Sequence, residues 1–586
     1  MFLLNLKRFV KSPVFLIGTL VYIVILYLMQ PVHVATGIED ISNSTLTTQS
    51  FSFFYFMMIS YEFFYQIVKQ NLEEIVCVSK MGIMKEKMYG ILIFLGIDMI
   101  LYIVYLTVSM IGTTSILHYF HMDWFWMLVK AYFMYHFLTY LFAILIGMLI
   151  SMIRSRIKGI FALVVVFSFF SKIIYPIIMQ CAASSEKGTH ILDILGIMNR
   201  NYYVFCDLIY NYTTEAVNLQ RIMFWVLLAI SLFLLVVNKK RKKIVTGIMF
   251  VVTFVDFLFY MQPSGERYVY GNWGAYMDEQ QYYSLLYWKN EGKADEHKRI
   301  GRTYQTPNFK ITKYKAALYP KRVLHASVDV MVDQYGLDQY CFTLYHGYKL
   351  QKVMDQNGEE LVFEQDIDHV LVKTNKAHHV EAIHFEYEGY SRKYVATSQA
   401  LFLAGNFPYL PNAGWNEYMI EPIGDHWQVG YNLKGAMYPI YYDIQIDAGQ
   451  KVYSNLKEIE ANHYTGVSEG ATFAASPFIE RMQLKNCVVY YPVLAANYRG
   501  ENLEKTGKKY EDAVDALKRK EQEKGNLLVI FDLSSVMDAD ISWYIAKDHM
   551  IASADQLQEL YDYYMEAGCT IDHTKWDKEE ADLEGN

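Results

Sequence analysis

Cysteine is scarce in this sequence of 586 residues, which contains only six. A small secreted scaffold held together by disulfides is therefore excluded. Cys181 and Cys206 lie in one predicted loop and could pair, whereas Cys341, Cys487 and Cys569 are expected to be free thiols. The sequence also lacks a G-x-x-x-x-G-K-[ST] loop, so the chain does not contain the phosphate-binding segment of a P-loop ATPase. It lacks the zinc-binding H-E-x-x-H helix as well.

The two parts of the chain differ in charge. Residues 1–262 contain 20 Lys and Arg residues against 13 Asp and Glu residues, whereas residues 263–586 contain 33 against 48. The net charges are therefore +7 and −15, which together give the −8 of the whole chain. A basic, apolar first part and an acidic, polar second part predict two domains in different solvents, the first in lipid and the second in water.

Long apolar runs dominate residues 1–262. A helix needs about 20 mostly apolar residues to cross about 30 Å of hydrocarbon. The second run is the weakest, because Tyr61, Glu62, Tyr65 and Gln66 interrupt it and must face protein or water. The first run is too long for a cleavable signal peptide and is expected to be an anchor. The predicted spans are about 13–29, 51–68, 89–112, 124–150, 159–180, 221–238 and 244–262.

The connections between these spans predict the orientation. Cytoplasmic loops of membrane proteins carry an excess of Lys and Arg. The other loops, 30–50, 113–123 and 181–220, contain only two basic residues, Lys187 and Arg200. We therefore expect a multi-pass protein of the cell membrane with a cytoplasmic N-terminus and an extracellular C-terminal domain. The basic connections contain Lys7, Arg8, Lys11; Lys69, Lys80, Lys85, Lys87; Arg154, Arg156, Lys158; and Lys239 to Lys243.

Two short segments on the cytoplasmic side are amphipathic. Residues 1–12 mix apolar and basic side chains and predict a helix in the headgroup layer, with a plain basic flank as the alternative. Residues 70–84 predict a second short helix, which could dock on a soluble partner; a solvated connector is the alternative. Its apolar face has Leu72, Ile75 and Val76, another face has Glu73 and Glu74, Gly82 suits a turn, and Lys85 belongs to the basic flank.

This arrangement resembles the type-2 ABC exporter permeases over about residues 1–238. Members of that family have an N-terminal elbow helix, six spans and a coupling helix between the second and third spans, here Asn71 to Lys87. The segment Ile197 to Tyr203 resembles the family's outer segment before the sixth span, without its Pro. The resemblance implies a separate ABC-type ATPase that drives transport, and a second permease, identical or different. The seventh span, 244–262, departs from the six-span plan.

Ionisable side chains inside the predicted spans are costly, and they are candidates for function. Lys130 lies near a helix end and Asp256 near the outer surface, so both are expected to reach water. Glu62, Asp98 and Lys172 lie deeper. Pairing of an acid with Lys172 across the bundle and contact with a transported compound are equally good interpretations.

Residues 263–586 show the period-two alternation of strands, bounded by turn signals such as Asn357-Gly358. The predicted fold class is therefore a membrane all-α bundle with seven transmembrane helices, followed by an extracellular β-rich α+β domain. The expected strands are 324–332, 369–373, 382–387, 440–447, 452–455 and 527–531, and the expected helices are 276–290, 503–524 and 554–566.

Part of this region resembles the N-terminal β-domain of aminopeptidase-N-like zinc peptidases, over about residues 307–485, with a fainter α/β remnant over 486–586. The resemblance is carried by His369 to Lys373, Val380 to Tyr390, Phe407 to Pro411, Tyr441 to Ile446 and Val452 to Asn455. The catalytic motif is missing, so we expect no enzymatic activity, no catalytic residues and no cofactor. The group His378, His379, Glu381 and His384 looks metal-binding, but on a strand His378 and His384 are about 20 Å apart, so no metal site is expected.

Three functions remain open from the sequence. The first is the permease subunit of a bacterial ABC exporter for a peptide-like or amphipathic compound, in which the outer domain gates or captures it. The second is a membrane sensor or scaffold that binds a ligand outside and does not transport. The third is a non-catalytic pseudo-peptidase subunit. The expected partners are an ABC-type ATPase, a second permease and membrane lipid, and no nucleic acid.

Overall fold

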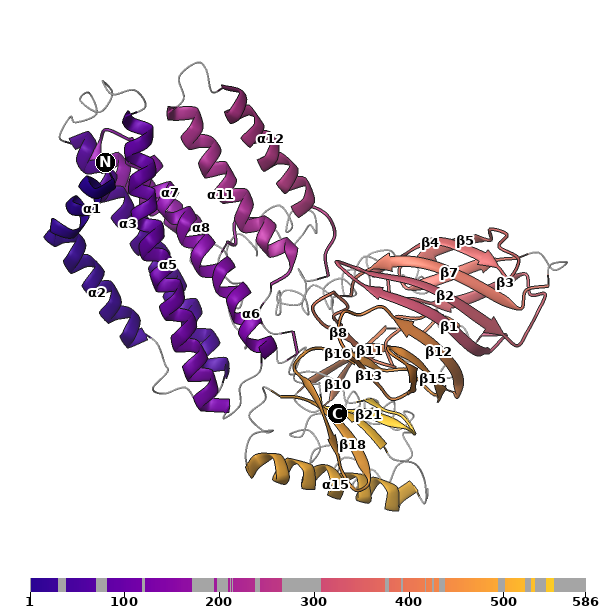
Figure 1. Cartoon of the computed structure of the whole chain (residues 1–586). Coiled ribbons are helices and arrows are strands. Elements are labelled where there is room, and N and C mark those ends of the chain that lie inside the picture. The colour runs from indigo at the N-terminus through magenta and orange to yellow at the C-terminus, as the bar shows by residue number, and fades with distance from the viewer. Residues whose placement is uncertain are drawn as a thin grey trace, which may run out of the picture.

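The computed structural model has a bundle of helices joined to a β-rich region (Figure 1). The confirmed part of the sequence prediction is this order, a helical N-terminal region followed by strands. The structure describes residues 2–29, 38–69, 82–117, 122–170, 194–197, 209–210, 212, 214–237, 243–265, 307–374, 379–391, 394–416, 418–423, 426–431, 438–493, 501–521, 528–532 and 544–552.

The helices differ in how well each one alone could cross a membrane. Four apolar stretches within them are long enough, Met84–Gly112, Met122–Ile150, Ala216–Val236 and Lys243–Tyr260. A fifth is possible if the pair Asn5–Lys11 and Phe15–Ile25, bent by 67°, is one span. The helices are α1 (Phe2–Lys11), α2 (Pro13–Met29), α3 (Ile38–Lys69), α5 (Gly82–Leu117), α6 (Met122–Tyr132), the π-helical turn η2 (Phe133–Leu138), α7 (Thr139–Ile150), α8 (Arg156–Phe170), α11 (Ala216–Val237) and α12 (Lys243–Tyr260).

Seven spans are therefore not confirmed, and two of the predicted ones have physical reasons to differ. The predicted span 51–68 lies within α3. Polar side chains lower the hydropathy of this helix, and they are tolerated there because they face other helices. The Ser60 hydroxyl donates to the Ile144 carbonyl oxygen (2.8 Å), and the Gln49 amide donates to the Tyr135 carbonyl oxygen. The predicted span 159–180 begins in α8, but the residues after Phe170 lie outside the described part.

The helix α3 packs in the middle of the bundle, against α2, α5, α7 and α8. Its closest approach to α7 depends on Gly147, where an added Cβ would lie 2.3 Å from the Met57 carbonyl oxygen. Aromatic rings fill the rest of the interface, including Phe53, Phe56 and Phe142. In contrast, α12 exposes most of its apolar side chains, as a helix surrounded by lipid would.

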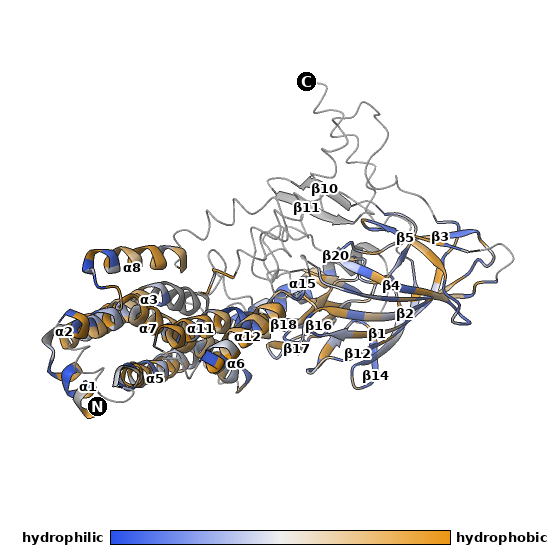
Figure 2. Cartoon of the chain, turned by 90° about the horizontal axis from the view of Figure 1, so that it is seen from above, coloured by the Kyte–Doolittle hydropathy of each residue, from blue (hydrophilic) through white to orange (hydrophobic). Residues whose placement is uncertain are grey.

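The strands form one large sheet and several small ones, which we call the β-domain (residues 307–493). Figure 2 shows mostly hydrophobic bundle helices beside strands that alternate between hydrophilic and hydrophobic residues. The strands of the β-domain are β1 (Ile311–Pro320), β2 (Leu324–Val332), β3 (Gln339–Thr343), β4 (Tyr348–Asp355), β5 (Val362–Asp366), β6 (His369–Lys373), β7 (Ala382–Gly389), β8 (Leu401–Leu403), β9 (Asn412–Ala413), β10 (Tyr418–Ile423), β11 (His426–Tyr431), β12 (Ile440–Ile446), β13 (Val452–Ser454), β14 (Lys457–Glu460), β15 (His463–Ser468), β16 (Phe473–Ala475), β17 (Ile479–Gln483) and β18 (Cys487–Pro492).

The large sheet has the strand order β14-β15-β12-β1-β2-β7-β4. Its pairs are antiparallel except for β1 and β12, which are parallel, with Ala316 opposite Ile444. Strand β2 alternates strictly between buried and half-exposed residues, as the sequence predicts for a sheet with one face on the core. The smaller sheets have the orders β5-β6-β3-β9, β13-β16-β8 and β10-β11.

The last described part is a small α/β unit, whose sheet includes β17 and β18 from the end of the β-domain. Its sheet has the order β17-β18-β19-β21-β20, and β18, β19 and β21 are parallel. Helix α15 connects β18 to β19 and packs on β18, as a crossover between parallel strands requires. The further elements are α15 (Glu501–Glu521), β19 (Leu528–Phe531), β20 (Tyr544–Ile545) and β21 (His549–Ile551). The predicted helices 276–290 and 554–566 lie outside the described residues.

Candidate functional site

Helix α1 packs across the ends of α3 and α5, at the end of the bundle that lies away from the β-domain (Figure 1). The Arg8 guanidinium donates to the Phe63 carbonyl oxygen of α3 (2.8 Å) and lies 3.9 Å from the Glu86 carboxylate of α5. It also stacks on the Phe63 ring, 3.8 Å from its centre. The Asn5 amide donates to the Glu86 carbonyl oxygen. Thus α1 joins the two helices on either side of the predicted coupling segment.

The predicted coupling residues lie partly outside the described chain. Leu72, Glu73, Glu74 and Ile75 fall within the undescribed residues 70–81. Gly82, expected at a turn, is instead the first residue of α5, and Lys85 is exposed one turn later.

Of the predicted second cytoplasmic loop, Arg154 lies between α7 and α8, and Arg156 and Lys158 lie in the first turn of α8. All three are exposed. Arg156 lies 3.5 Å from Glu62, so this acid has an ion-pair partner at the end of α3. Lys172, the predicted partner of an acid across the bundle, lies outside the described residues. Nearby, the Tyr65 hydroxyl donates to the Arg154 carbonyl oxygen.

The middle of the bundle contains two ionisable side chains. Asp98 is the midpoint of the apolar stretch Met84–Gly112, and His136 is the midpoint of Met122–Ile150. Asp98 is fully buried, and neither carboxylate oxygen has a hydrogen-bond partner in the described part of the chain. His136 lies in η2, where its Nδ1 atom is 2.8 Å from the Tyr140 hydroxyl and its ring stacks on Tyr105. Single π-helical turns inside α-helices often mark functional positions.

The opposite end of the bundle is fastened to the β-domain by Arg322, which begins the turn into β2. Its guanidinium donates to the carbonyl oxygens of Pro263 (2.9 Å), Gln262 (2.9 Å) and Tyr260 (3.3 Å), and to the Gln220 side-chain oxygen (3.1 Å). A cation is favourable here because the carbonyl groups at the end of α12 have no partners within the helix.

A second fastening point is Gln399. Its side-chain amide donates to the carbonyl oxygens of Tyr210 (2.6 Å) and Tyr212 (2.7 Å), and its oxygen accepts from the Thr214 hydroxyl. The two parts also exchange side chains. Phe478 of the β-domain packs in the core of the bundle, edge-on to Trp124, whereas Tyr210 packs in the core of the β-domain.

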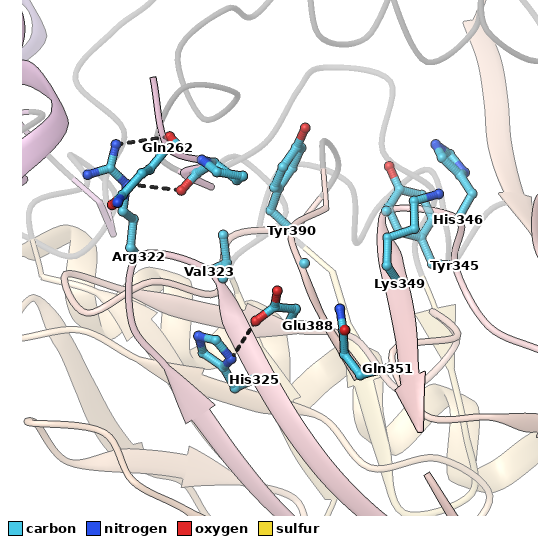
Figure 3. Close-up of a pocket in the computed structure, with 13 residues that line it drawn as sticks. Gln262, Arg322, Val323, His325, Tyr345, His346, Lys349, Gln351, Glu388 and Tyr390 are labelled. Atoms are coloured by element: carbon cyan, nitrogen blue, oxygen red, sulfur yellow. Dashed lines mark hydrogen bonds and ion pairs between the residues drawn. The ribbon is translucent and has the colours of Figure 1, made fainter. Parts of the chain in front are cut away.

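A cavity of about 700 Å³ lies beside the Arg322 contact (Figure 3). It is enclosed by the residues just after α12 and by the adjoining ends of β2, β4 and β7. The backbones of Gly347 and Gly389 cross at its wall, where a Cβ on Gly389 would lie 1.9 Å from the Gly347 carbonyl oxygen. The lining residues are Gln262, Pro263, Arg322, Val323, His325, Tyr345, His346, Gly347, Lys349, Gln351, Glu388, Gly389 and Tyr390.

Three of the lining side chains form one row across the sheet. Glu388 of β7 stands opposite His325 of β2 and opposite Lys349 of β4. The Glu388 carboxylate lies 3.0 Å from His325 Nδ1. His346 is engaged by the buried Asp368 (3.1 Å). Lys349 forms no hydrogen bond through its ammonium group and no ion pair with any residue that the structure describes.

A hydroxyl, an imidazole and a carboxylate also form a chain of hydrogen bonds at the α/β unit. The Thr472 hydroxyl is 2.8 Å from His549 Nε2, and His549 Nδ1 is 3.0 Å from the Asp548 carboxylate. Thr472 and His549 are fully buried, and the Thr472 hydroxyl accepts from the Gly405 amide, so the hydroxyl and the imidazole are shielded from solvent. Burial opposes ionisation of Asp548, but hydrogen bonds from His549, Asn455 and Ser468 outweigh it and hold the pKa of Asp548 below its usual range. The arrangement joins the α/β unit to the β-domain.

Two of the histidines that looked metal-binding, His379 and His384, form carboxylate pairs in the structure, whereas His378 lies outside the described residues. His379 Nε2 is 2.9 Å from Glu381, and His384 Nδ1 is 2.6 Å from Asp329 on the neighbouring strand. In the described ranges, no group of three or more His, Cys, Asp or Glu side chains could hold a metal ion. Cys341 and Cys487 are buried and form no disulfide within the described residues, whereas Cys181, Cys206 and Cys569 lie outside them.

Neither the fastening residues nor the cavity is predicted by the sequence. Arg322, Gln399 and Lys349 are ordinary polar residues at strand ends, and no local pattern distinguishes them from other surface residues. The only signal in the sequence is the position of Arg322 just before the alternating run 324–332, which places it next to the start of a predicted strand.

Comparison with known proteins gives only a partial likeness. No family model matches the sequence, and no curated protein matches it. The neighbours of the β-rich C-terminal region among solved structures include zinc peptidases. Native leukotriene A4 hydrolase from Saccharomyces cerevisiae has 11% identity and a TM-score of 0.31, covering 46% of this chain and 44% of that chain. The M1 zinc metallopeptidase from Deinococcus radiodurans has 12% identity and a TM-score of 0.29, covering 44% and 64%. This chain therefore spans less than two thirds of either protein.

Proposed function

We propose that this chain is the transmembrane subunit of an ABC exporter for a peptide-like or amphipathic compound, driven by a separate ATPase. In this proposal the chain crosses the cell membrane seven times, with its N-terminus in the cytoplasm and its β-domain outside. The charge distribution supports this orientation, because the described basic residues Lys85, Arg154 and Lys158 lie at the start of α5 and between α7 and α8 or in the first turn of α8. These helix ends lie near α1, at the end of the bundle away from the acidic β-domain (Figure 1).

The observation that carries the proposal is the position of Arg8. It contacts α3 and α5, the two helices between which residues 70–81 run. An ATPase that pressed on this segment would therefore move α1, α3 and α5 together. The amphipathic composition of α1 and its bend into α2 suit a helix that lies at the membrane surface before the first span.

The fastening of the β-domain supports a mechanical role for it. Arg322 binds the end of α12, and Gln399 binds the chain just before α11, so a movement of either helix is transmitted to the β-domain. Coupling of this kind needs elements with two discrete arrangements, such as helices that shift against each other. A second copy or a different permease subunit would complete the path, and the ATPase would supply the energy.

The test is purification of the tagged full-length protein in mild detergent from its own host. We expect an ABC-type ATPase to copurify, and we expect Glu73→Lys together with Glu74→Lys to release it by reversing the charge of the coupling segment. Glu360→Gln is the matched control, because this acid pairs with Lys352 on the β-domain and lies far from the coupling segment.

The outcomes separate the candidate functions. Release by the double variant, with retention in the control, supports the permease, and stimulation of ATP hydrolysis by candidate compounds becomes the next assay. A stable protein that never retains an ATPase overturns the proposal. The cavity would then favour a membrane sensor that binds a ligand outside the cell.

A further inference from the structure

The cavity between α12 and the β-domain has a size that suits a small ligand, since pockets for small molecules usually measure about 300–1,000 Å³. Its walls combine apolar surface with several polar side chains. Tyr345, Tyr390, Val323 and Pro263 supply apolar surface. Figure 3 shows the Tyr390 side chain rising between Arg322 on one side and Lys349 on the other.

The charges in the lining favour an anion. With neutral histidines, the lining contains two cations, Arg322 and Lys349, against one carboxylate, Glu388. Arg322 uses its N–H groups on the end of α12, and Glu388 is engaged by His325. Lys349 is exposed and has no ion pair in the described part of the chain, so its ammonium group is available to a ligand.

The surroundings of the cavity favour a ligand that also has an alkyl chain. The cavity begins at Gln262, two residues after the end of α12. The apolar side chains of Val251, Phe254, Leu258 and Phe259 are exposed along this helix. A chain attached to a headgroup in the cavity could therefore lie against α12, within the lipid.

We propose that this cavity binds the anionic headgroup of an amphipathic molecule, with Lys349 contacting the phosphate or carboxylate and Tyr390 the adjoining apolar part. The inference rests on the proposed function only for the position of the cavity at the outer membrane surface. The ligand could come from two sources, an anionic lipid of the membrane or an anionic amphipathic compound that the protein exports.

Dodecyl phosphate is the probe, titrated into the labelled full-length protein in neutral maltoside micelles and followed by microscale thermophoresis. We expect Lys349→Gln to weaken binding about tenfold or more, because a charge-assisted contact is lost. Glu388→Gln should strengthen binding, because it removes the carboxylate beside the ligand. Lys352→Gln is the matched control, since Lys352 lies on the same strand but pairs with Glu360 and does not line the cavity.

The result that overturns the proposal is equal binding by the wild type and Lys349→Gln, or an equal loss in Lys352→Gln, which would indicate nonspecific attraction. Thermal unfolding of each variant verifies that the fold is retained. Copurification of the ATPase should be unchanged in Lys349→Gln, so failure of this inference is distinguishable from failure of the proposed function.

The source of the ligand follows from repeating the titration in nanodiscs. If discs that contain phosphatidylglycerol suppress binding of dodecyl phosphate relative to discs of phosphatidylcholine, a lipid headgroup occupies the cavity. If both discs give the same affinity, the cavity selects a separate amphipathic anion.

Discussion

Asp98 is the most unusual single residue of the bundle, because it is a carboxyl group at the middle of an apolar helix without a hydrogen-bond partner in the described chain. About 21 Å of helix separates it from either end of its apolar stretch, at 1.5 Å per residue. Such a group is costly inside a membrane, and it persists where function requires it. The described part of the chain therefore gives this carboxyl group no stabilising hydrogen bond.

We predict that Asp98→Asn leaves the stability unchanged to within about 1 kcal/mol or raises it, because no hydrogen bond is lost. Ser60→Ala is the comparison, since its hydroxyl donates to Ile144 and its loss should destabilise by about 1 kcal/mol. Thermal unfolding in detergent measures both. A large loss in Asp98→Asn would mean that the carboxylate has a partner, whereas preserved stability with lost transport would identify a functional group.

Asp548 shows the opposite behaviour, because hydrogen bonds stabilise its charged form. Since the pKa of Asp548 is lower in the folded protein than its usual value of about 3.9, its contribution to stability is present above about pH 4. This contribution is lost as the pH falls through the folded pKa.

We predict that Asp548→Asn lowers the free energy of unfolding by about 1–3 kcal/mol at pH 7, and that the difference from the wild type narrows below about pH 4. Denaturant unfolding followed by intrinsic fluorescence at several pH values measures this. Asp512→Asn, an exposed site on α15, should show no comparable difference. A difference that stayed constant down to pH 3 would contradict the assignment.

At the scale of elements, the crossing of α3 and α7 depends on a glycine that brings two backbones together. A methyl group at position 147 would meet the Met57 carbonyl oxygen, which is backbone and cannot turn aside. In contrast, Gly96 of α5 has open space where its Cβ would be.

Gly147→Ala should therefore destabilise the bundle by about 1–3 kcal/mol, because the helices must separate. Gly96→Ala should be neutral or stabilising by up to about 1 kcal/mol, since alanine favours a helix. Thermal unfolding and size-exclusion profiles in detergent compare the two. If both variants behaved alike, the close crossing would not be present in the membrane.

At the scale of the whole molecule, Arg322 and Gln399 unite two parts with separate cores. We predict that Arg322→Ala together with Gln399→Ala loosens the β-domain without unfolding either part, so that thermal unfolding changes from one transition to two. Cleavage by a protease near residues 262–265 should also become faster. Lys321→Ala is the matched control, because Lys321 precedes Arg322 but is exposed and does not bind α12. If the wild type, the double variant and Lys321→Ala unfolded identically, the contacts of Arg322 and Gln399 would not be what holds the two parts together.

Local patterns predicted the elements but not their relations. The alternation in 324–332, 369–373 and 382–387 predicted β2, β6 and β7, since each strand buries one face or lies inside the core. The parallel pair β1 and β12 joins segments more than 120 residues apart, so no local signal reports it. The hydropathy of α3 is low because the helix contains polar side chains, which form hydrogen bonds inside the bundle. The role proposed for Lys349 depends on its position near the end of α12, which no local sequence pattern reports.

The exchange of Phe478 and Tyr210 between the two cores bears on the order in which the protein can be made. Trp124 and its neighbours emerge from the ribosome more than 350 residues before Phe478. The apolar surface of the bundle that Phe478 covers is therefore incomplete through most of synthesis. Tyr210 in turn waits for the β-domain whose core it enters. A chain released early would expose both apolar surfaces, and exposed apolar surface of this kind promotes aggregation.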